Sequence, residues 1–571
     1  MLRSLRISAS ALAMTLGLAL TLEAEPASGP YLAGRHAALN SDFSAAARYY
    51  SEALMRDPGN PEMMESAALS FLSLGQVDKA LPLAKAMERG GQRSQVAQLL
   101  VVAGLAKQGD FEALLARDAD HSDLGPWVDG LVRAWAHMGA GDVTAALAQF
   151  DALGKEAGMQ GFVMYHKALA LASVGDFEGA DAIFSADGAG SASQTRRGAI
   201  AHAQILAQLE RPQAALTLLE KSFGEATDPE LEQLTTALET GESVTFSLVP
   251  DAAAGIAEVF FTFGAVLKSE AAGDYYVLLY SRIARYLKPD HIEALLLTAD
   301  LLENLGQHDP AIEEYKAVPA SDPAYHAAEL GRADALRRSG KIVQAIEVLE
   351  QLSRSHGDLA VVHSTLGDVL RSEEQYDAAI AAYGRALDRT SEANPARWVL
   401  FYSRGIAHER SGNGEAAEED FRAALTLNPE QPQVLNYLGY SLVEQQRNLD
   451  EALDMIERAV AASPDSGYIV DSLGWVLYRL GRYDEAKKHM ERAVELLPVD
   501  PVVNDHLGDV YWAVGRKREA EFQWRRALSF TGGAEDDGEA DPKRIRRKLE
   551  VGLDAVLQAE GAAPLKVAAE K

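Results

Sequence analysis

The sequence contains no cysteine among its 571 residues. Disulfide bonds, iron–sulfur clusters, thiolate zinc sites and cysteine nucleophiles are therefore excluded, and no lipid anchor on cysteine is expected. Aromatic residues are also scarce, at 7% of the chain, whereas alanine and leucine are abundant. This composition favours packed α-helices over β-sheets.

Basic residues are too few to balance the acidic ones. The chain has 54 Lys and Arg against 84 Asp and Glu, which gives a net charge of −30. Phosphate backbones select basic surfaces, so we do not expect a nucleic-acid partner. An anionic membrane surface repels the same charge. Hydrophobic residues make up 47% of the chain, a share that is typical of a folded protein rather than a disordered one.

Sequence motifs of common enzymes are missing. The sequence has no His-Glu-x-x-His and no Gly-x-Ser-x-Gly, and it has no complete phosphate-binding loop because Gly340-Lys341 is followed by Ile342. The 13 histidines are scattered, and none forms a clear metal-ligand pair. We therefore expect a protein that is not an enzyme, with no catalytic residues, no metal site and no cofactor.

The first 24 residues have the order of an export signal. Arg3 and Arg6 precede a largely apolar run from Ile7 to Leu22, and small and polar residues follow. This order is typical of a secretory signal peptide, so residues 1–24 predict export to the periplasm and cleavage. The run is shorter than the roughly 20 apolar residues of a stable membrane span. Two alternatives stay open: an uncleaved anchor, which would be the membrane contact, and a buried first helix.

A short pattern of small residues recurs along the chain at a nearly constant period. Gly474 is followed by Ala486, and one unit later Gly508 is followed by Ala520. The second of these positions can be traced through fourteen units, and only the interval between Ala215 and Val277 is much longer than the others. These positions are Ala46, Ala80, Ala113, Ala146, Ala180, Ala215, Val277, Ala311, Ala345, Ala379, Ala417, Ala452, Ala486 and Ala520.

This pattern resembles the tetratricopeptide repeat (TPR), a helix–turn–helix unit of about 34 residues. The resemblance implies an all-α fold in which successive units stack into a right-handed TPR α-solenoid superhelix with a C-terminal capping helix. Two antiparallel helices touch closely only where both carry small residues. The Gly or Ala of the first helix and the Ala of the second helix are therefore expected at the crossing point of each pair.

The long interval between Ala215 and Val277 spans nearly two units and interrupts the period, and residues 241–250 read as extended chain. We therefore predict two solenoid blocks. The predicted division is a signal peptide at 1–24, an N-terminal solenoid at 30–225, an irregular connector at 226–251, a C-terminal solenoid at 252–530, an acidic linker at 531–541, a capping helix at 542–559 and a disordered tail at 560–571.

Five basic residues lie within six positions of the predicted capping helix. They are Lys543, Arg544, Arg546, Arg547 and Lys548. One interpretation is a patch for an acidic partner or nucleic acid. The other is a solvated helix face that pairs with the adjacent acidic linker, and the acidic, exported character of the chain favours this one.

The first helices of TPR units line the concave groove of the superhelix, where positions 5 and 9 of each unit face inward. Aromatic rings together with Asn and Asp offer stacking area and hydrogen bonds to an extended peptide. The predicted partner-binding groove of the C-terminal block consists of Tyr402, Asn436, Tyr440, Asp471, Trp475, Asp505, Asp509 and, at the rim, Trp512. The alternative is that Tyr440 and Trp475 only pack between repeats. Some TPR proteins clamp a terminal carboxylate with Lys, Arg and Asn; these acidic and aromatic positions do not favour that mode.

Residues 258–530 look like a group of exported proteobacterial TPR proteins, most clearly at 435–445, 468–486 and 503–528. This group includes lipoprotein adaptors of periplasmic carboxy-terminal processing proteases, although the lipidated cysteine is absent here. The resemblance implies a non-catalytic scaffold of the cell envelope that binds proteins or extended peptides, with a periplasmic protease among the candidate partners. The alternative is an accessory protein of envelope or polysaccharide assembly and export that binds glycan or a glycan enzyme.

Overall fold

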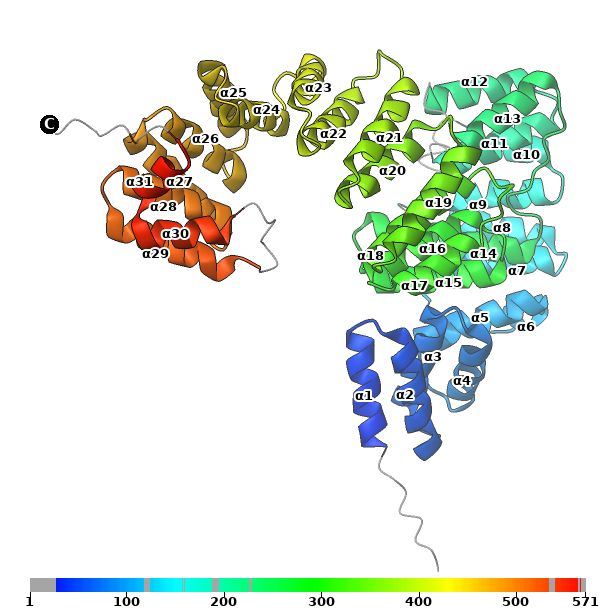
Figure 1. Cartoon of the computed structure of the whole chain (residues 1–571). Coiled ribbons are helices and arrows are strands. Elements are labelled where there is room, and N and C mark those ends of the chain that lie inside the picture. Colours follow the sequence, from blue (N-terminus) through cyan, green and yellow to red (C-terminus); the bar gives the residue numbers. More distant parts are fainter. Residues whose placement is uncertain are drawn as a thin grey trace, which may run out of the picture. The chain divides into compact units, whose positions relative to one another are not determined.

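The computed structural model describes residues 27–117, 124–156, 158, 160–186, 195–224, 228–532, 540–562 and 565. Every regular element in these ranges is a helix, so the predicted all-α fold is confirmed (Figure 1). The predicted signal peptide at 1–24 lies outside the described residues, as do most of the predicted acidic linker and tail.

The chain divides into two compact units, residues 1–348 and 349–571. The helices of unit 1 are α1 (Ser28–Leu39), α2 (Phe43–Arg56), α3 (Pro61–Ser73), α4 (Val77–Arg89), α5 (Gln95–Gln108), α6 (Phe111–Leu115), α7 (Pro126–Gly139), α8 (Val143–Leu153), α9 (Gln160–Ser173), α10 (Phe177–Phe184), α11 (Arg196–Gln208), α12 (Pro212–Phe223), α13 (Pro229–Thr240), α14 (Ala252–Ser269), α15 (Asp274–Leu287), α16 (Ile292–Asn304), α17 (His308–Lys316) and α18 (Tyr325–Arg338).

The unit boundary falls inside α19 (Ile342–Ser355). The remaining helices belong to unit 2. They are α20 (Ala360–Ser372), α21 (Tyr376–Asp388), α22 (Arg397–Arg410), α23 (Gly414–Leu427), α24 (Pro432–Glu444), α25 (Leu449–Ala462), α26 (Gly467–Arg479), α27 (Tyr483–Leu496), α28 (Pro501–Ala513), α29 (Lys517–Phe530), α30 (Pro542–Val551) and α31 (Leu553–Ala559).

Local sequence explains how the helix pairs are made. Gly481 and Gly515 reverse the chain between the two helices of their repeats with φ of 77° and 82°, a region that glycine enters without steric cost. In unit 1, Asp42 and Asp142 cap the second helices α2 and α8, because each side chain accepts a hydrogen bond at 2.9 Å from the amide three residues later.

The predicted crossing points are confirmed. All fourteen traced positions are fully buried except Ala113, which lies in the short α6 and is partly exposed. On the facing helix, a Cβ at Gly508 would lie 2.4 Å from the Trp524 ring, and a Cβ at Gly474 would lie 2.8 Å from Met490. Glycine is therefore required here by the close approach of the partner side chain.

In unit 1, a later part of the chain fills the groove of an earlier part. α14 packs on α5, α7 and α9, and α15 packs on α3 and α5. These are the first helices of consecutive pairs, which line the concave side of a TPR array. At the contact, a Cβ on Gly255 would lie 2.2 Å from the Trp135 ring. The N-terminal groove is thus occupied by the chain itself.

α14 is the one helix, among those described, that is long and apolar enough to cross a membrane by length and composition. Half of that helix is buried inside the fold. It also carries Glu258, which is 1% exposed and accepts hydrogen bonds from Tyr165 Oη and Arg197 Nη2, both at 2.8 Å. The apolar side chains of α14 belong to the core of unit 1.

The structure divides the chain differently from the predicted connector at 226–251. Val249 is fully buried, and Gln208 Nε2 donates a hydrogen bond to the Val244 carbonyl, so the extended segment is held on the fold. The predicted blocks at 30–225 and 252–530 are not separate units, because α14 and α15 return onto the earlier helices. A broken period shows where a repeat array is interrupted, but it does not show where the chain goes next.

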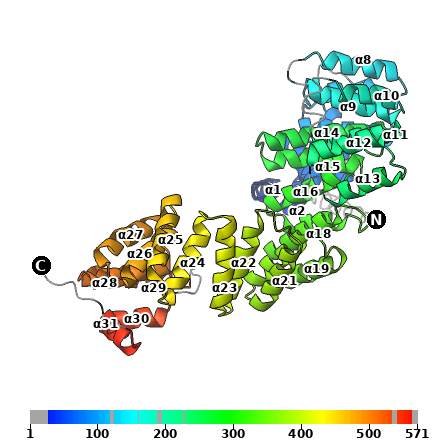
Figure 2. The ribbon, with the colours of Figure 1, turned by 90° about the horizontal axis from the view of Figure 1, so that it is seen from above.

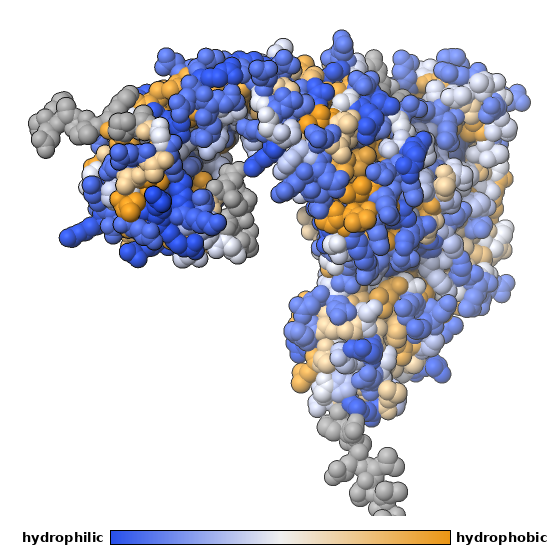
Figure 3. Space-filling view, viewed as in Figure 1, coloured by the Kyte–Doolittle hydropathy of each residue, from blue (hydrophilic) through white to orange (hydrophobic). Residues whose placement is uncertain are grey.

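Unit 2 is a regular stack in which each helix packs on its neighbours in the chain, from α20 to α29 (Figure 2). The capping helix predicted at 542–559 is present as two helices, α30 and α31, because Gly552 with φ of 82° interrupts it. α30 packs on α29 and closes this end of the stack. Hydrophilic side chains cover most of the face shown in Figure 3, as the net charge of −30 leads one to expect.

Candidate functional site

A hollow of about 700 Å³ opens along the first helices of four consecutive helix pairs in unit 2. We call it the unit 2 hollow. Its walls come from α22, α24, α26 and α28 and from the residues just before α26 and α28. The lining residues are Glu409, Arg410, Gln433, Asn436, Tyr437, Tyr440, Ser466, Tyr468, Ile469, Asp471, Ser472, Asp500, Val502, Val503 and His506. Three predicted groove residues, Asn436, Tyr440 and Asp471, are among them.

Two acceptor atoms of the hollow stand without a hydrogen-bond partner in the described part of the chain. They are Asn436 Oδ1 and Asp471 Oδ1, both buried. The other oxygen of Asp471 accepts a hydrogen bond from His506 Nδ1 at 2.9 Å, and the whole Asp471 side chain is only 8% exposed. Because nearly all buried polar atoms in proteins are paired, these two atoms point to a ligand that donates hydrogen bonds.

His506 is held in place from two sides. Its ring stacks on Trp475 with 4.0 Å between ring centroids and 14° between planes. Burial by itself lowers the pKa of His506, but the carboxylates of Asp471, Asp505 and Asp509 overcome it and raise the pKa above the ordinary value. The protonated imidazole is therefore favoured beside Asp471.

Tyrosine rings supply the apolar part of the hollow. Tyr437, Tyr440 and Tyr468 line it, and Tyr468 is 57% exposed. The predicted contact Tyr402 does not line the hollow. Its half-buried ring lies edge-on to Tyr437, with 5.5 Å between centroids, and against Phe421. Tyr402 thus contacts the lining residue Tyr437 rather than the hollow itself.

Trp475 likewise contacts a lining residue, His506, without lining the hollow itself. It is 9% exposed, its Nε1 donates to Glu444 Oε1 at 2.9 Å, and its ring stacks on those of Tyr478 and His506. The lining residues do not include it. This position matches the alternative interpretation, in which Trp475 packs between repeats. Its ring affects the hollow only by stacking on His506 and so fixing the position of that side chain.

Asp505 and Asp509 are covered by the C-terminal helix α30. Lys548 Nζ, with a fully buried side chain, lies 2.9 Å and 2.8 Å from the two oxygens of Asp505 and 2.6 Å from Asp509 Oδ1. Arg544 adds a contact at 3.7 Å to Asp509, and Trp524 Nε1 donates to it at 2.9 Å. These two predicted groove residues therefore bind the protein's own lysine.

The predicted rim residue Trp512 faces the same C-terminal helices. Its Nε1 donates to Asp554 Oδ2 at 2.9 Å, and a Cβ on Gly552 would lie 2.7 Å from its ring. Trp512 therefore fixes the junction of α30 and α31 rather than lining the hollow.

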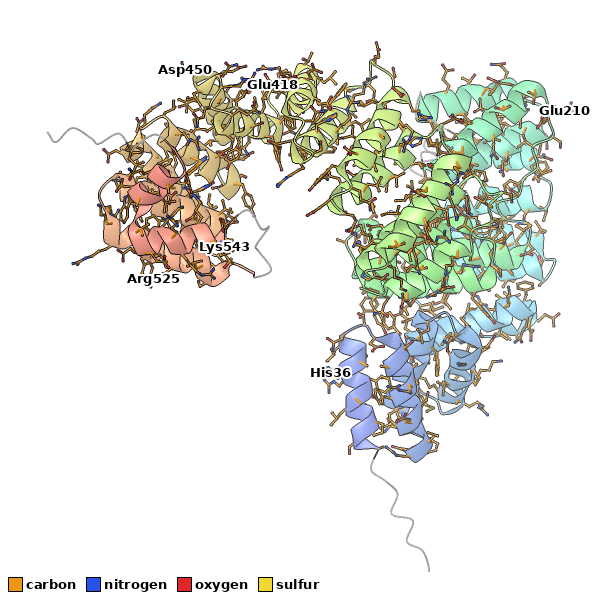
Figure 4. All side chains as sticks on the ribbon, viewed as in Figure 1. His36, Glu210, Glu418, Asp450, Arg525 and Lys543 are labelled. Carbon is orange, nitrogen blue, oxygen red and sulfur yellow. The ribbon has the colours of Figure 1, made fainter. Side chains whose placement is uncertain are left out.

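The basic cluster of α30 has a mixed role. Lys543, Arg546 and Arg547 are exposed, which agrees with the interpretation as a solvated face (Figure 4). That interpretation is wrong for Lys548, which is buried. Arg544 is partly exposed, and its Nε donates to Glu560 Oε1 at 2.9 Å.

Sequence reasoning missed several lining residues, Tyr468 and His506 among them. Tyr468 precedes Asp471 by three residues, which is one helical turn, so both lie on one face of α26. That spacing was available in the sequence. The position of His506 depends on its stacking with Trp475, which the sequence alone does not indicate.

A second hollow, of about 340 Å³, lies in unit 1 beside α11 and α16. Its two arginines are already paired: Arg196 with Asp228 at 2.7 Å, and Arg197 with Glu258 at 2.8 Å. No group of three or more His, Asp or Glu that could hold a metal ion occurs within the described ranges. The unit 2 hollow is therefore the stronger candidate site.

The fold and the hollow define a helical-repeat solenoid with an open groove in its C-terminal unit. Models of the tetratricopeptide repeat match the chain over residues 31–94, 296–360 and 402–467, over 360–392 and over 470–498. The chain therefore carries tetratricopeptide repeats over these residues.

The chain is similar to the TPR repeat-containing protein PA4667 of Pseudomonas aeruginosa, with 28% identity over 174 residues. That match covers 30% of this chain and 28% of the relative. Among solved structures, the Cut9–Hcn1 hetero-tetramer of the APC/C gives a TM-score of 0.38 at 15% identity, covering 93% of this chain and 96% of the other. Yeast Tom70 gives 0.35 at 14% identity, covering 94% and 98%.

Proposed function

We propose that the protein is a non-catalytic scaffold or adaptor that holds an extended peptide segment of a partner protein in the unit 2 hollow. The observation that carries this proposal is the pair of buried acceptors without partners, Asn436 Oδ1 and Asp471 Oδ1, in a hollow flanked by tyrosines. An unmet buried acceptor costs about 1–3 kcal/mol. A peptide carries an N–H donor at almost every residue and side chains that stack on aromatic rings.

Two other stretches of groove are already occupied by the chain itself. In unit 1, α14 and α15 occupy the concave side of the N-terminal helices. At the C-terminal end of unit 2, Lys548 occupies the acidic positions Asp505 and Asp509. The stretch between α22 and α28 has no such covering segment among the described residues, and it is long enough for several residues of extended chain at about 3.3 Å each.

Photo-cross-linking tests this proposal. A photoreactive phenylalanine derivative placed at Tyr468, which is exposed in the hollow, should cross-link to a defined peptide segment of a partner, identified by mass spectrometry. The same group placed at Asp450, exposed on α25 (Figure 4), is the matched control and should give none. Equal cross-linking at both positions would contradict a groove function, and cross-linked glycan at Tyr468 would support the alternative role in polysaccharide assembly.

We also propose that the protein works in the cell envelope after export, with a periplasmic protease among its candidate partners. The support is the order of Arg3, Arg6 and the apolar run to Leu22. N-terminal sequencing of the protein from a periplasmic fraction should begin near residues 25–30. Intact Met1 on soluble cytoplasmic protein would contradict export.

A further inference from the structure

We infer that the unit 2 hollow selects its peptide by a lysine or arginine side chain, which Asp471 and Asn436 bind. This inference rests on the proposed function and names the chemistry of the ligand. It is argued from three observations: a lysine already bound at the equivalent position of the next repeat, the unpaired oxygen of Asp471, and the charge of the lining.

The protein itself shows what this groove position binds. Asn436, Asp471 and Asp505 occupy the same position in consecutive repeats, because each follows the one before it by one repeat length. At Asp505, both carboxylate oxygens accept hydrogen bonds from the ammonium group of Lys548, at 2.9 Å and 2.8 Å. The repeat geometry therefore presents a carboxylate that can receive a cationic side chain.

Asp471 presents a carboxylate at the equivalent position, and one of its oxygens has no hydrogen-bond partner. Oδ2 is bound by His506, whereas Oδ1 is buried without a partner. Asn436 Oδ1, also a lining atom, is in the same condition. Both atoms only accept hydrogen bonds. A lysine ammonium carries three N–H donors and an arginine guanidinium carries five, so one such side chain has donors for both.

The charged lining residues favour a cation over an anion. Three carboxylates, from Glu409, Asp471 and Asp500, outnumber the two basic side chains of the lining, Arg410 and His506. One of these carboxylates, Asp500, also caps α28 by accepting from the Val503 amide at 2.9 Å. A terminal carboxylate or a phosphate would meet the charge of Asp471 and find its acceptors unmatched. A basic side chain meets both requirements.

Fluorescence anisotropy with the full chain tests the inference. The probes are labelled nonapeptides with blocked ends, from a positional library in which one residue is fixed as Lys, Arg, Gln or Glu. At one position, Lys and Arg should bind about tenfold more tightly than Gln, since a charge-assisted hydrogen bond is about twice as strong as a neutral one. Asp471→Asn should abolish this preference. Asp450→Asn, an equal change of charge at an exposed site on α25, should retain it.

A gain of charge provides a second test that does not depend on the stability of Asp471→Asn. Asn436→Asp adds a carboxylate at the equivalent position and should strengthen binding of the Lys peptide several-fold without strengthening that of the Gln peptide. The inference is wrong, while the proposed function stands, if peptides bind with no preference for Lys or Arg. It is also wrong if the preference survives in Asp471→Asn and is unchanged in Asn436→Asp. If no peptide of the library binds, the proposed function fails as well.

Discussion

At the scale of single residues, the buried carboxylates of the two units differ in how completely they are paired. Glu258 accepts hydrogen bonds from Tyr165 and Arg197 and lies 3.4 Å from His291. Burial alone raises the pKa of Glu258, but Arg197 and His291 reverse the effect and hold the pKa well below its usual range. Asp471 keeps one oxygen unpaired. The first carboxylate is fully paired within the fold, whereas the second has an oxygen that a ligand can use, as the proposed function requires.

The first prediction concerns pH and His506. Its pKa is raised, chiefly by Asp471 against the opposing effect of burial, so the imidazole is protonated below this raised value and neutral above it. Loss of that proton makes the hollow more negative. Binding of the Lys nonapeptide, measured by anisotropy, should therefore tighten several-fold as the pH rises from about 6 through this raised value, as long as lysine is still charged.

The controls for this pH dependence are a variant and a neutral peptide. His506→Gln keeps a hydrogen-bond donor near Asp471 but does not titrate, so its affinity for the Lys peptide should be nearly constant over this range. The Gln peptide should show little change with wild-type protein. The other charged groups around His506 include Asp471, Asp505 and Asp509, and Glu409, Arg410 and Asp500 line the same hollow. A pH dependence of equal size in His506→Gln would assign the effect to one of these groups.

The second prediction separates a groove residue from a packing residue. Trp475→Ala removes a nearly buried ring that stacks on Tyr478 and His506, and it should cost about 3 kcal/mol of unfolding free energy. Tyr468→Ala removes an exposed ring from the hollow. It should leave stability within about 0.5 kcal/mol but weaken peptide binding by about 2 kcal/mol, roughly thirtyfold. Urea unfolding and anisotropy measure the two effects. The opposite pattern would place Trp475 in the binding surface.

The sequence predicted some residues of the site and missed others, and the reason is physical. Positions 5 and 9 of a repeat are fixed by helical geometry, so Asn436, Tyr440 and Asp471 line the hollow as predicted. What covers each position depends on distant segments. Lys548, 43 residues after Asp505, buries that carboxylate, and neither composition nor period indicates it.

At the scale of helices, α30 closes the stack by placing a lysine in an acidic groove position. Lys548 Nζ is surrounded by Asp505, Asp509 and the Trp524 ring, whose centroid is 5.8 Å away. A charge that is buried in this way is stable only while it is paired. The position of α30 therefore depends on a few contacts, and it can be tested by removing one of them.

The third prediction is that Lys548→Met destabilises unit 2 by about 3 kcal/mol at neutral pH, because it leaves two buried carboxylates without their cation. Burial raises the pKa of Asp505; Lys548 opposes the rise and Asp509 adds to it. A carboxyl with a raised pKa stabilises the fold below its unfolded-state pKa and loses that contribution as pH rises through the folded value. Without Lys548 the pKa rises further, so the loss should be larger at about pH 7.5 than at about pH 4.

Urea unfolding at these two pH values measures this effect, and the matched control is Lys543→Met. Lys543 lies exposed on the same helix (Figure 4), so this variant removes the same charge without uncovering a carboxylate and should change stability by less than about 0.5 kcal/mol. Equal losses in the two variants would show that Lys548 contributes only general charge to α30.

The period of the sequence predicted the paired helices well, because small residues at fixed spacing are required wherever two helices cross. Gly552 shows the limit. Its φ of 82° ends α30 and divides the predicted capping helix, but a glycine within a short apolar pattern is also compatible with a continuous helix. The sequence likewise did not predict that α14 packs on α7, because an apolar helix does not indicate which surface it covers.

At the scale of the whole chain, the two units differ in what occupies the concave side of their helix pairs. Unit 1 uses its own helices α14 and α15 to fill the concave side of α3, α5, α7 and α9. Among the described residues of unit 2, α30 covers the end of the groove, and the hollow between α22 and α28 is open. Under the proposed function, unit 2 would be the part that binds a partner, because its groove is the open one.

The fourth prediction follows from the separate cores of the two units. Phe421, on α23, and Phe260, on α14, are both fully buried, and replacing either by alanine should cost about 3–5 kcal/mol locally. Because repeats contact mainly their neighbours, the loss should stay near the substitution. In hydrogen-exchange mass spectrometry, Phe421→Ala should speed exchange in α22–α24 and leave α14 and α15 unchanged, and Phe260→Ala should do the reverse. Faster exchange throughout the chain in both variants would show instead that the two units unfold together as one cooperative array.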